Sequence, residues 1–144
     1  MELFDTSALI LAARLPAVAD ALREAIDGPG LAVTDVIVVE YLNGARNLPE
    51  YDRFARALDA ATLLRVEVSD WERVRDTHRR LAALGAGHQR AASIPDLIIA
   101  AVAERHGVLV VHYDEVYDRI AGVTGQPARW VVPRGSADTG SRRG

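Results

Sequence analysis

Four acidic residues have positions in the sequence from which they could act together in chemistry. Asp5 directly follows the apolar pair Leu3-Phe4, and Asp114 lies just past the β-branched run 108–111. Both runs predict short strands, and open α/β folds bind ligands beyond the carboxyl ends of their strands. We therefore expect Asp5 and Asp114 to project from the same edge of a sheet.

Glu40 and Asp96 lie within or beside helical segments that are apolar on almost every face. Glu40 interrupts the run 36–42, and Asp96 opens the run 97–103. A helix that is apolar all round is typically buried, and an isolated ionised carboxylate in such a helix destabilises the fold unless it has a partner. A bound metal ion is one of the few partners that would make these positions tolerable.

Each of the four acids also has a purely structural interpretation. Asp5 and Asp96 could cap helices, Asp114 could be an ordinary turn residue after a strand, and Glu40 could pair with a buried arginine. The positions taken together favour a shared site, because all four point to one end of one sheet.

The ligand types indicate which metal such a site would hold. The chain has no Cys, and its four His residues do not have the spacing of a metal site. Hard oxygen ligands without nitrogen or sulfur suit Mg²⁺, with Mn²⁺ as an alternative, rather than Zn²⁺.

Composition narrows the classes of protein that remain. The 144 residues suit one compact soluble domain, and no apolar run is long enough for a membrane span or resembles a signal peptide, so we expect a cytoplasmic protein. All 17 basic residues are Arg, which a GC-rich genome would explain and which also suits binding of phosphates. The absence of Lys excludes phosphoryl transfer through an aspartyl phosphate in the enzyme classes that need a lysine.

Alternation of strand-like and helical segments predicts an α/β fold. The pattern indicates a mostly parallel central sheet of about five strands, flanked by helices in a three-layer sandwich. The expected strands are 3–4, 31–34, 63–68, 108–111 and 129–132. The expected helices are 7–14, 16–26, 35–46, 50–61, 69–84 (opened by a capping box, Ser69 to Glu72), 95–105 and 115–121. Residues 1–133 form the predicted domain, and 134–144 a C-terminal tail that we expect to be disordered because it has almost nothing to bury.

An ordered set of motifs resembles the PIN-domain superfamily. Residues 5–9 (DTSAL) are similar to the opening of these proteins, and Glu40, residues 94–101 (IPDLIIAA) and residues 112–121 continue the match in order. The resemblance spans roughly residues 2 to 133, and it is greatest to the VapC-type ribonuclease toxins of bacterial toxin–antitoxin pairs.

The resemblance implies a Mg²⁺-dependent endoribonuclease that hydrolyses RNA, is inhibited by a cognate VapB-type antitoxin and forms a homodimer. Carried over by position, Asp5, Glu40, Asp96 and Asp114 are the metal-site and catalytic acids. Asp5 and Asp96 would hold the metal with the other two in support, and the metal would activate a water to attack phosphorus.

Several further residues enter with that resemblance. Ser7 or Thr6 would supply a hydroxyl that hydrogen-bonds a carboxylate or a metal-bound water. Many relatives read D-x-D-F in the last motif, where this chain has Val116 for the second Asp and Tyr117 for Phe. This leaves open whether Glu115 or Asp118 substitutes as a further acid, and whether one or two metals are held.

The sequence gives less information about which residues contact the substrate. Four carboxylates would repel an RNA backbone, so arginines must help to hold it. We selected Arg14, Arg46 and Arg90 for their predicted places in loops or at helix ends. A PIN-like scaffold that binds RNA or protein without cleavage is the alternative function.

Overall fold

Five parallel strands form the centre of the molecule. The computed structural model describes residues 1–138. The strands are β1 (Glu2–Phe4), β2 (Leu31–Thr34), β3 (Thr62–Leu64), β4 (Leu109–His112) and β5 (Ala128–Trp130), in the order β3-β2-β1-β4-β5. β1 is central, with Phe4 paired to Val111 of β4 and Leu3 paired to Ala32 of β2. The predicted fold class, a parallel five-stranded sheet between helices, is confirmed.

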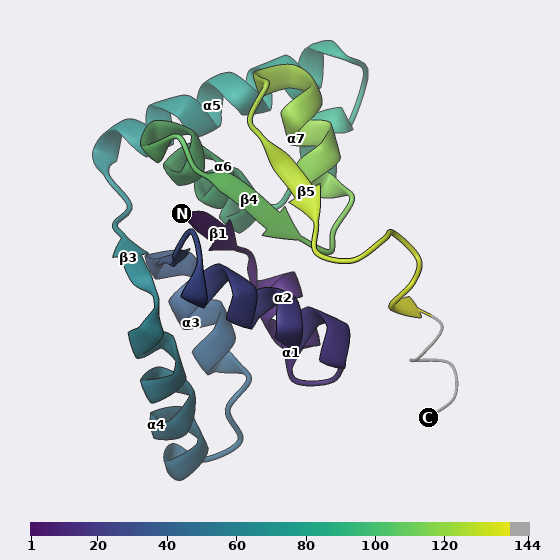
Figure 1. Ribbon diagram of the computed structural model, residues 1–144. Helices are drawn as coiled ribbons and strands as arrows, with labels where there is room; N and C mark the ends of the chain where they lie inside the picture. Colours follow the sequence, from purple (N-terminus) through teal and green to yellow (C-terminus); the bar gives the residue numbers. More distant parts are fainter. Residues whose placement is uncertain (139–144) are drawn as a thin grey trace.

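Helices connect the strands and flank the sheet. They are α1 (Thr6–Ala12), α2 (Pro16–Asp27), α3 (Asp35–Asn43), α4 (Leu48–Ala57), α5 (Val68–Ala83), α6 (Ile94–His106) and α7 (Val116–Thr124), with short 3₁₀ turns η1 (Leu58–Ala60) and η2 (His88–Ala91). Figure 1 shows α5, α6 and α7 gathered around β4 and β5, whereas α3 packs beside β2 and against α4, which lies at the opposite end of the molecule.

Helix α6 is the buried helix that its composition predicted. All residues from 97 to 103 are buried, and the Ser93 hydroxyl oxygen accepts a hydrogen bond from the backbone N–H of Asp96. At the other end Gly107 adopts φ 64°, a left-handed conformation in which glycine ends a helix without steric cost. Asp96 is therefore fixed in the first turn of a rigid core element.

Helix α3 does not have the environment that we predicted for it. Only Ile37 and Leu42 are buried, and Val39 is 67% exposed and Glu40 is also exposed. A helix lying against one side of the core presents one face to it, and the remaining apolar side chains face outward whatever their type. The inference that Glu40 lies in a buried helix was therefore wrong.

The start of α5 also differs from the prediction. The predicted capping box joined Ser69 to Glu72, but the carboxylate of Asp70 accepts the backbone N–H of Glu67 at 2.7 Å. Asp70 is buried and receives two hydrogen bonds from the guanidinium of Arg105 on α6. The observed N-cap is Glu67, two residues before the predicted Ser69. The strand β3 ends at Leu64, earlier than predicted.

Residues 134–138 of the predicted tail have defined contacts. The Tyr113 hydroxyl oxygen accepts the backbone N–H groups of Gly135 and Ala137, and Ala137 belongs to the buried core. Arg134 pairs with Glu115 and lies over the Trp130 ring. These five residues thus differ from the expectation of a disordered segment. The rest of the predicted tail, 139–144, lies outside the described residues.

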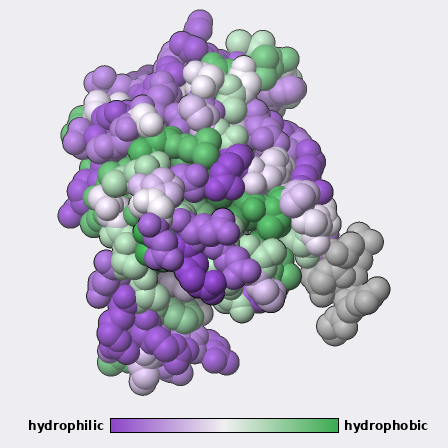
Figure 2. Space-filling view, in the orientation of Figure 1, coloured by the Kyte–Doolittle hydropathy of each residue, from purple (hydrophilic) through white to green (hydrophobic). Residues whose placement is uncertain are grey.

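The molecular surface is polar with several apolar interruptions. Figure 2 shows hydrophobic patches between hydrophilic areas on the face that it presents. The most exposed large apolar side chains in residues 1–138 include Val39, Leu48, Val68 and Leu84. No helix within this part of the chain is both long and apolar enough to cross a membrane.

Candidate metal-dependent nuclease site

Asp5 and Asp114 reach the same edge because their strands are neighbours. β1 and β4 pair in parallel, and the backbone N–H of Asp5 extends the ladder by donating to Val111 at 2.9 Å. Both strands end at this point, so the residues that follow them emerge together. The predicted placement of these two acids at the carboxyl end of the sheet agrees with the structure.

Asp5 is a buried carboxylate with three donors. It caps α1, and its Oδ2 accepts the hydroxyl of Ser7 at 2.7 Å and the Ser7 backbone N–H at 3.1 Å. Its Oδ1 accepts the hydroxyl of Tyr117 at 2.8 Å. The capping role that we considered as an alternative is therefore real, and Asp5 performs it while facing the other acids.

Asp96 shares the site from the first turn of α6. The Ser93 hydroxyl donates to its Oδ2 at 2.7 Å, and the Tyr117 hydroxyl lies 3.3 Å from its Oδ1. Burial, reinforced by the charges of Asp5 and Asp114, raises the pKa of Asp96 to about 6, although the two hydroxyl contacts oppose the shift. The helix cap is Ser93, so Asp96 is not explained by capping alone.

Asp114 completes the group from the loop after β4. Its Oδ1 accepts the backbone N–H of Val116, which turns the chain into α7. Its own backbone N–H donates to Nδ1 of His112 at 3.1 Å. His112 is fully buried, and burial lowers its pKa, so the neutral ring with an acceptor at Nδ1 holds this turn.

Glu40 approaches Asp5 from α3 and is the most peripheral acid. Its Oε1 accepts the hydroxyl of Thr6 at 2.9 Å. Partial burial of the carboxylate and the charge of Asp5 raise the pKa of Glu40, against the effect of the Thr6 hydrogen bond. The alternative of a buried arginine partner is not found in residues 1–138. Thr6 and Ser7 thus each bond an acid, Glu40 and Asp5 respectively.

The four acids have no cationic partner among residues 1–138. Within the described chain, none of them forms an ion pair with an arginine, although ten arginines pair with other acids. Glu115 and Asp118, the suggested substitutes for the missing acid, have other partners. Arg119 and Arg134 bind Glu115, and the indole N–H of Trp130 donates to Asp118.

A divalent cation fits this donor set. No three His, Asp or Glu side chains in residues 1–138 lie close enough to ligate one ion directly. Mg²⁺, however, retains several waters and usually binds through only one or two carboxylates. Carboxylate oxygens that have no arginine partner within residues 1–138 suit such an ion, and Asp5 and Asp96, which share the Tyr117 hydroxyl, are two acids that could hold it.

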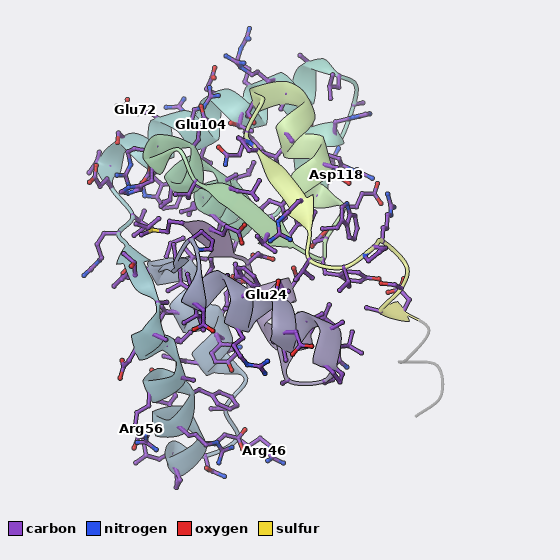
Figure 3. The ribbon with its side chains drawn as sticks, in the orientation of Figure 1. Glu24, Arg46, Arg56, Glu72, Glu104 and Asp118 are labelled. Atoms are coloured by element: carbon purple, nitrogen blue, oxygen red, sulfur yellow. The ribbon has the colours of Figure 1, made fainter. Side chains whose placement is uncertain are left out.

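The arginines selected from the sequence have different surroundings. Arg14 and Arg90 are exposed and have no ion pair within the described chain. Arg46 binds Glu50 through Nε and Nη2, and Figure 3 places it beside α4, at the end of the molecule away from α7.

Sequence reasoning did not select Arg119 or recognise the role of Tyr117. Arg119 lines a hollow of about 330 Å³ together with Asp114, Glu115, Val116 and Ala91. Its position one turn into α7 gave no signal of that proximity. Tyr117 stood beside the last motif in the sequence, but the direction of its hydroxyl could not be predicted from there.

The match to a family model agrees with this fold. The model described as "PIN domain" matches residues 3–123, and the chain belongs to the PIN-domain family. Among curated relatives, Ribonuclease VapC18 of Mycobacterium tuberculosis is 41% identical over 132 residues, covering 92% of this chain and 96% of that protein. Ribonuclease VapC51 of the same species is 41% identical over 136 residues, covering 94% and 96%. The resemblance predicted from the motifs is confirmed.

Solved structures show the same fold. A chain of VapBC2 from Rickettsia felis, bound to a DNA fragment from the promoter, superposes with a TM-score of 0.71 over 90% of this chain and 97% of that one, at 11% identity. A DNA-bound VapBC from Salmonella typhimurium gives a TM-score of 0.68 at 14% identity, covering 92% of this chain and 100% of that one. At these identities the likeness concerns the fold alone.

Proposed function

We propose that this protein is a divalent-metal-dependent endoribonuclease that acts as the toxin of a type II toxin–antitoxin pair. The observation that carries the proposal is that Asp96 lies near enough to Asp5 and Asp114, at the carboxyl edge of the sheet, to feel the charge of both, and no arginine of residues 1–138 pairs with any of the three. The curated relatives that span nearly the whole chain are named ribonucleases, which supports the same activity.

The chain's own residues prepare the site for Mg²⁺ or Mn²⁺. Asp5 and Asp96 would hold the ion, with Asp114 and Glu40 in support. The bound ion would supply an activated water and positive charge for an RNA phosphodiester. Ser7 and Ser93 fix one oxygen of Asp5 and of Asp96, so each carboxylate keeps its orientation before any ligand binds.

Substrate binding needs cations near this acidic edge. Arg119 lines the hollow beside Asp114, and Arg90 precedes Ala91, which lines the same hollow. Arginine guanidinium groups bind phosphate in a bidentate manner. We assign these two residues to the RNA backbone, together with the exposed Arg14 of the sequence-based proposal.

The exposed apolar surface supports protein partners, namely a VapB-type antitoxin and a second copy of this chain. A hollow of about 290 Å³ between α3 and α4 is lined by Val33, Val38, Leu42, Leu58 and Leu63, among others. Val39, next to it in sequence, is 67% exposed. Apolar surface of this kind marks interaction sites. We place the activity in the cytoplasm, where RNA substrates are available.

A cleavage assay separates this function from that of a non-cleaving scaffold. Purified protein should cut single-stranded or loop RNA in millimolar Mg²⁺ or Mn²⁺ and stop in EDTA, and Asp5→Asn should be inactive in both. Asn keeps the shape and the helix-capping oxygen, so loss of cleavage would reflect loss of the charge. Undiminished cleavage in chelator would reject the metal mechanism, and RNA binding without cleavage would favour the scaffold.

A further inference from the structure

Tyr117 brings a polar atom from the core to the acidic site. Its side chain is 2% exposed, and its ring packs against His112 with 5.0 Å between ring centroids. Its hydroxyl is the part of the side chain that reaches the two carboxylates. The oxygen lies 2.8 Å from Oδ1 of Asp5 and 3.3 Å from Oδ1 of Asp96. These two aspartates are 91 positions apart in the sequence.

In each of the two acids, one carboxylate oxygen is bonded by a serine nearby in sequence and the other by Tyr117. Oδ2 of Asp5 is held by Ser7, and Oδ2 of Asp96 is held by Ser93, each within its own helix start. The two Oδ1 atoms share Tyr117 instead. In residues 1–138 no other side chain is hydrogen-bonded to both acids, so this hydroxyl is the one side-chain link that joins the two carboxylates in that part of the chain.

We propose that Tyr117 is a positioning residue of the metal site, whose hydroxyl links Asp5 to Asp96 and sets the affinity of the site for a divalent cation. This inference rests on the proposed metal-dependent function. It gives the phenolic oxygen of Tyr117 a role that a phenylalanine at this position could not fulfil, because Phe has no group to form either contact.

The direction of approach explains why the hydroxyl would assist a cation. Tyr117 reaches the carboxylates from the buried side, whereas Asp96 is only half-buried and Asp114 is exposed toward solvent. Each carboxylate oxygen has two lone pairs, and the phenol occupies at most one on each Oδ1. Within residues 1–138 no other donor is hydrogen-bonded to either Oδ1, so each Oδ1 keeps a second lone pair for a cation. Partners of this kind typically change metal affinity about 10–100-fold.

The hydroxyl also offsets repulsion between the acids. The phenol has one proton, and the shorter distance indicates that it is directed mainly to Asp5. Placing this donor between two like charges favours their approach before a cation arrives.

The test compares Tyr117→Phe with Tyr113→Phe. Both variants lose one phenolic oxygen, but the Tyr113 hydroxyl binds the backbone of Gly135 and Ala137 and no site acid. Mn²⁺ binding measured by calorimetry and by the paramagnetic signal of the free ion should weaken about tenfold in Tyr117→Phe. Tyr113→Phe should match the wild type. The Mg²⁺ concentration for half-maximal RNA cleavage should shift by the same factor.

The possible outcomes separate this inference from the proposed function. If wild type binds Mn²⁺ and Tyr117→Phe binds it within twofold, the positioning role is overturned while the metal-dependent function stands. If wild type binds no Mn²⁺, the proposed function fails, and the role in setting cation affinity fails with it.

A metal-free measurement then decides whether the link to Asp5 itself exists. In EDTA, Tyr117→Phe should lower the melting temperature by several degrees, and by less than half as much in an Asp5→Asn background. The reason is that hydrogen bonds to an ionised acceptor are about twice as strong as neutral ones. An equal fall in melting temperature in both backgrounds would mean that the Tyr117 hydroxyl is not hydrogen-bonded to the Asp5 carboxylate.

Discussion

Thr6 donates its hydroxyl hydrogen to Oε1 of Glu40 over 2.9 Å, and this bond joins the first turn of α1 to the exposed face of α3. The two residues are 34 positions apart and belong to elements that pack together. Thr6 is the side chain in residues 1–138 that is hydrogen-bonded to the exposed Glu40, so it holds this carboxylate beside the site.

Removing the Thr6 hydroxyl should therefore impair catalysis without unfolding the protein. We expect Thr6→Val to reduce RNA cleavage about tenfold, because outer partners of metal-site carboxylates contribute on that scale. Thr6→Ser keeps the hydroxyl and should stay within threefold of the wild type. Cleavage rates at fixed Mg²⁺ provide the measurement, and an unimpaired Thr6→Val variant would place Glu40 outside the working site.

Asp96→Asn should abolish cleavage and yet stabilise the metal-free protein. The folded-state pKa of Asp96 is raised to about 6, so the native state binds a proton that the unfolded state has already lost. Its ionisation therefore reduces stability as pH rises from about 4 to about 6, and the penalty persists above that range. For this half-buried group we expect the variant to gain about 1 kcal/mol at neutral pH, after discounting for solvent screening.

Melting curves in EDTA between pH 4 and pH 8 measure this effect. The difference between variant and wild type should grow as pH rises, and Mg²⁺ should stabilise the wild type more than the variant by mass action. A variant that is less stable at every pH, with an unchanged response to Mg²⁺, would mean that Asp96 serves only the start of α6.

Truncation after Pro133 should lower stability, contrary to the expectation from composition. It removes the two backbone N–H groups that donate to the Tyr113 hydroxyl and exposes the core around Ala137. We expect a loss of about 1 kcal/mol, or about 4 °C in melting temperature. Tyr113→Phe in the full chain should lose a comparable amount. An unchanged melting temperature after truncation would show that this packing adds nothing to stability.

The loss of RNA binding in arginine variants should depend on how near each arginine lies to the acidic edge of the sheet. Arg119→Gln and Arg90→Gln should weaken RNA binding and lower the slope of binding against log salt by about one each, as expected for one lost phosphate contact. Arg46→Gln is the matched comparison, because Arg46 also pairs with a glutamate, as Arg119 does, but lies away from α7. An equal effect of all three would indicate binding by overall charge instead of a path beside Asp114.

The amino-acid sequence by itself determined the parallel α/β fold and the two acids that follow strands. Asp5 and Asp114 could be placed because a strand's direction fixes where the next residue emerges, and β1 and β4 are neighbours. The buried helix carrying Asp96 was equally readable, since residues 97–103 are apolar on every face and all are buried.

Only the tertiary structure decided the surroundings of these acids. The run around Glu40 is as apolar as that after Asp96, yet α3 exposes Val39 and Glu40, because local composition does not say which face of a helix the core covers. The sequence placed a tyrosine beside the last motif, but the contact of its hydroxyl with Asp5 and Asp96 depends on how α7 packs against α6 and β1. Such distances arise from the joint packing of separate elements, and no local pattern encodes them.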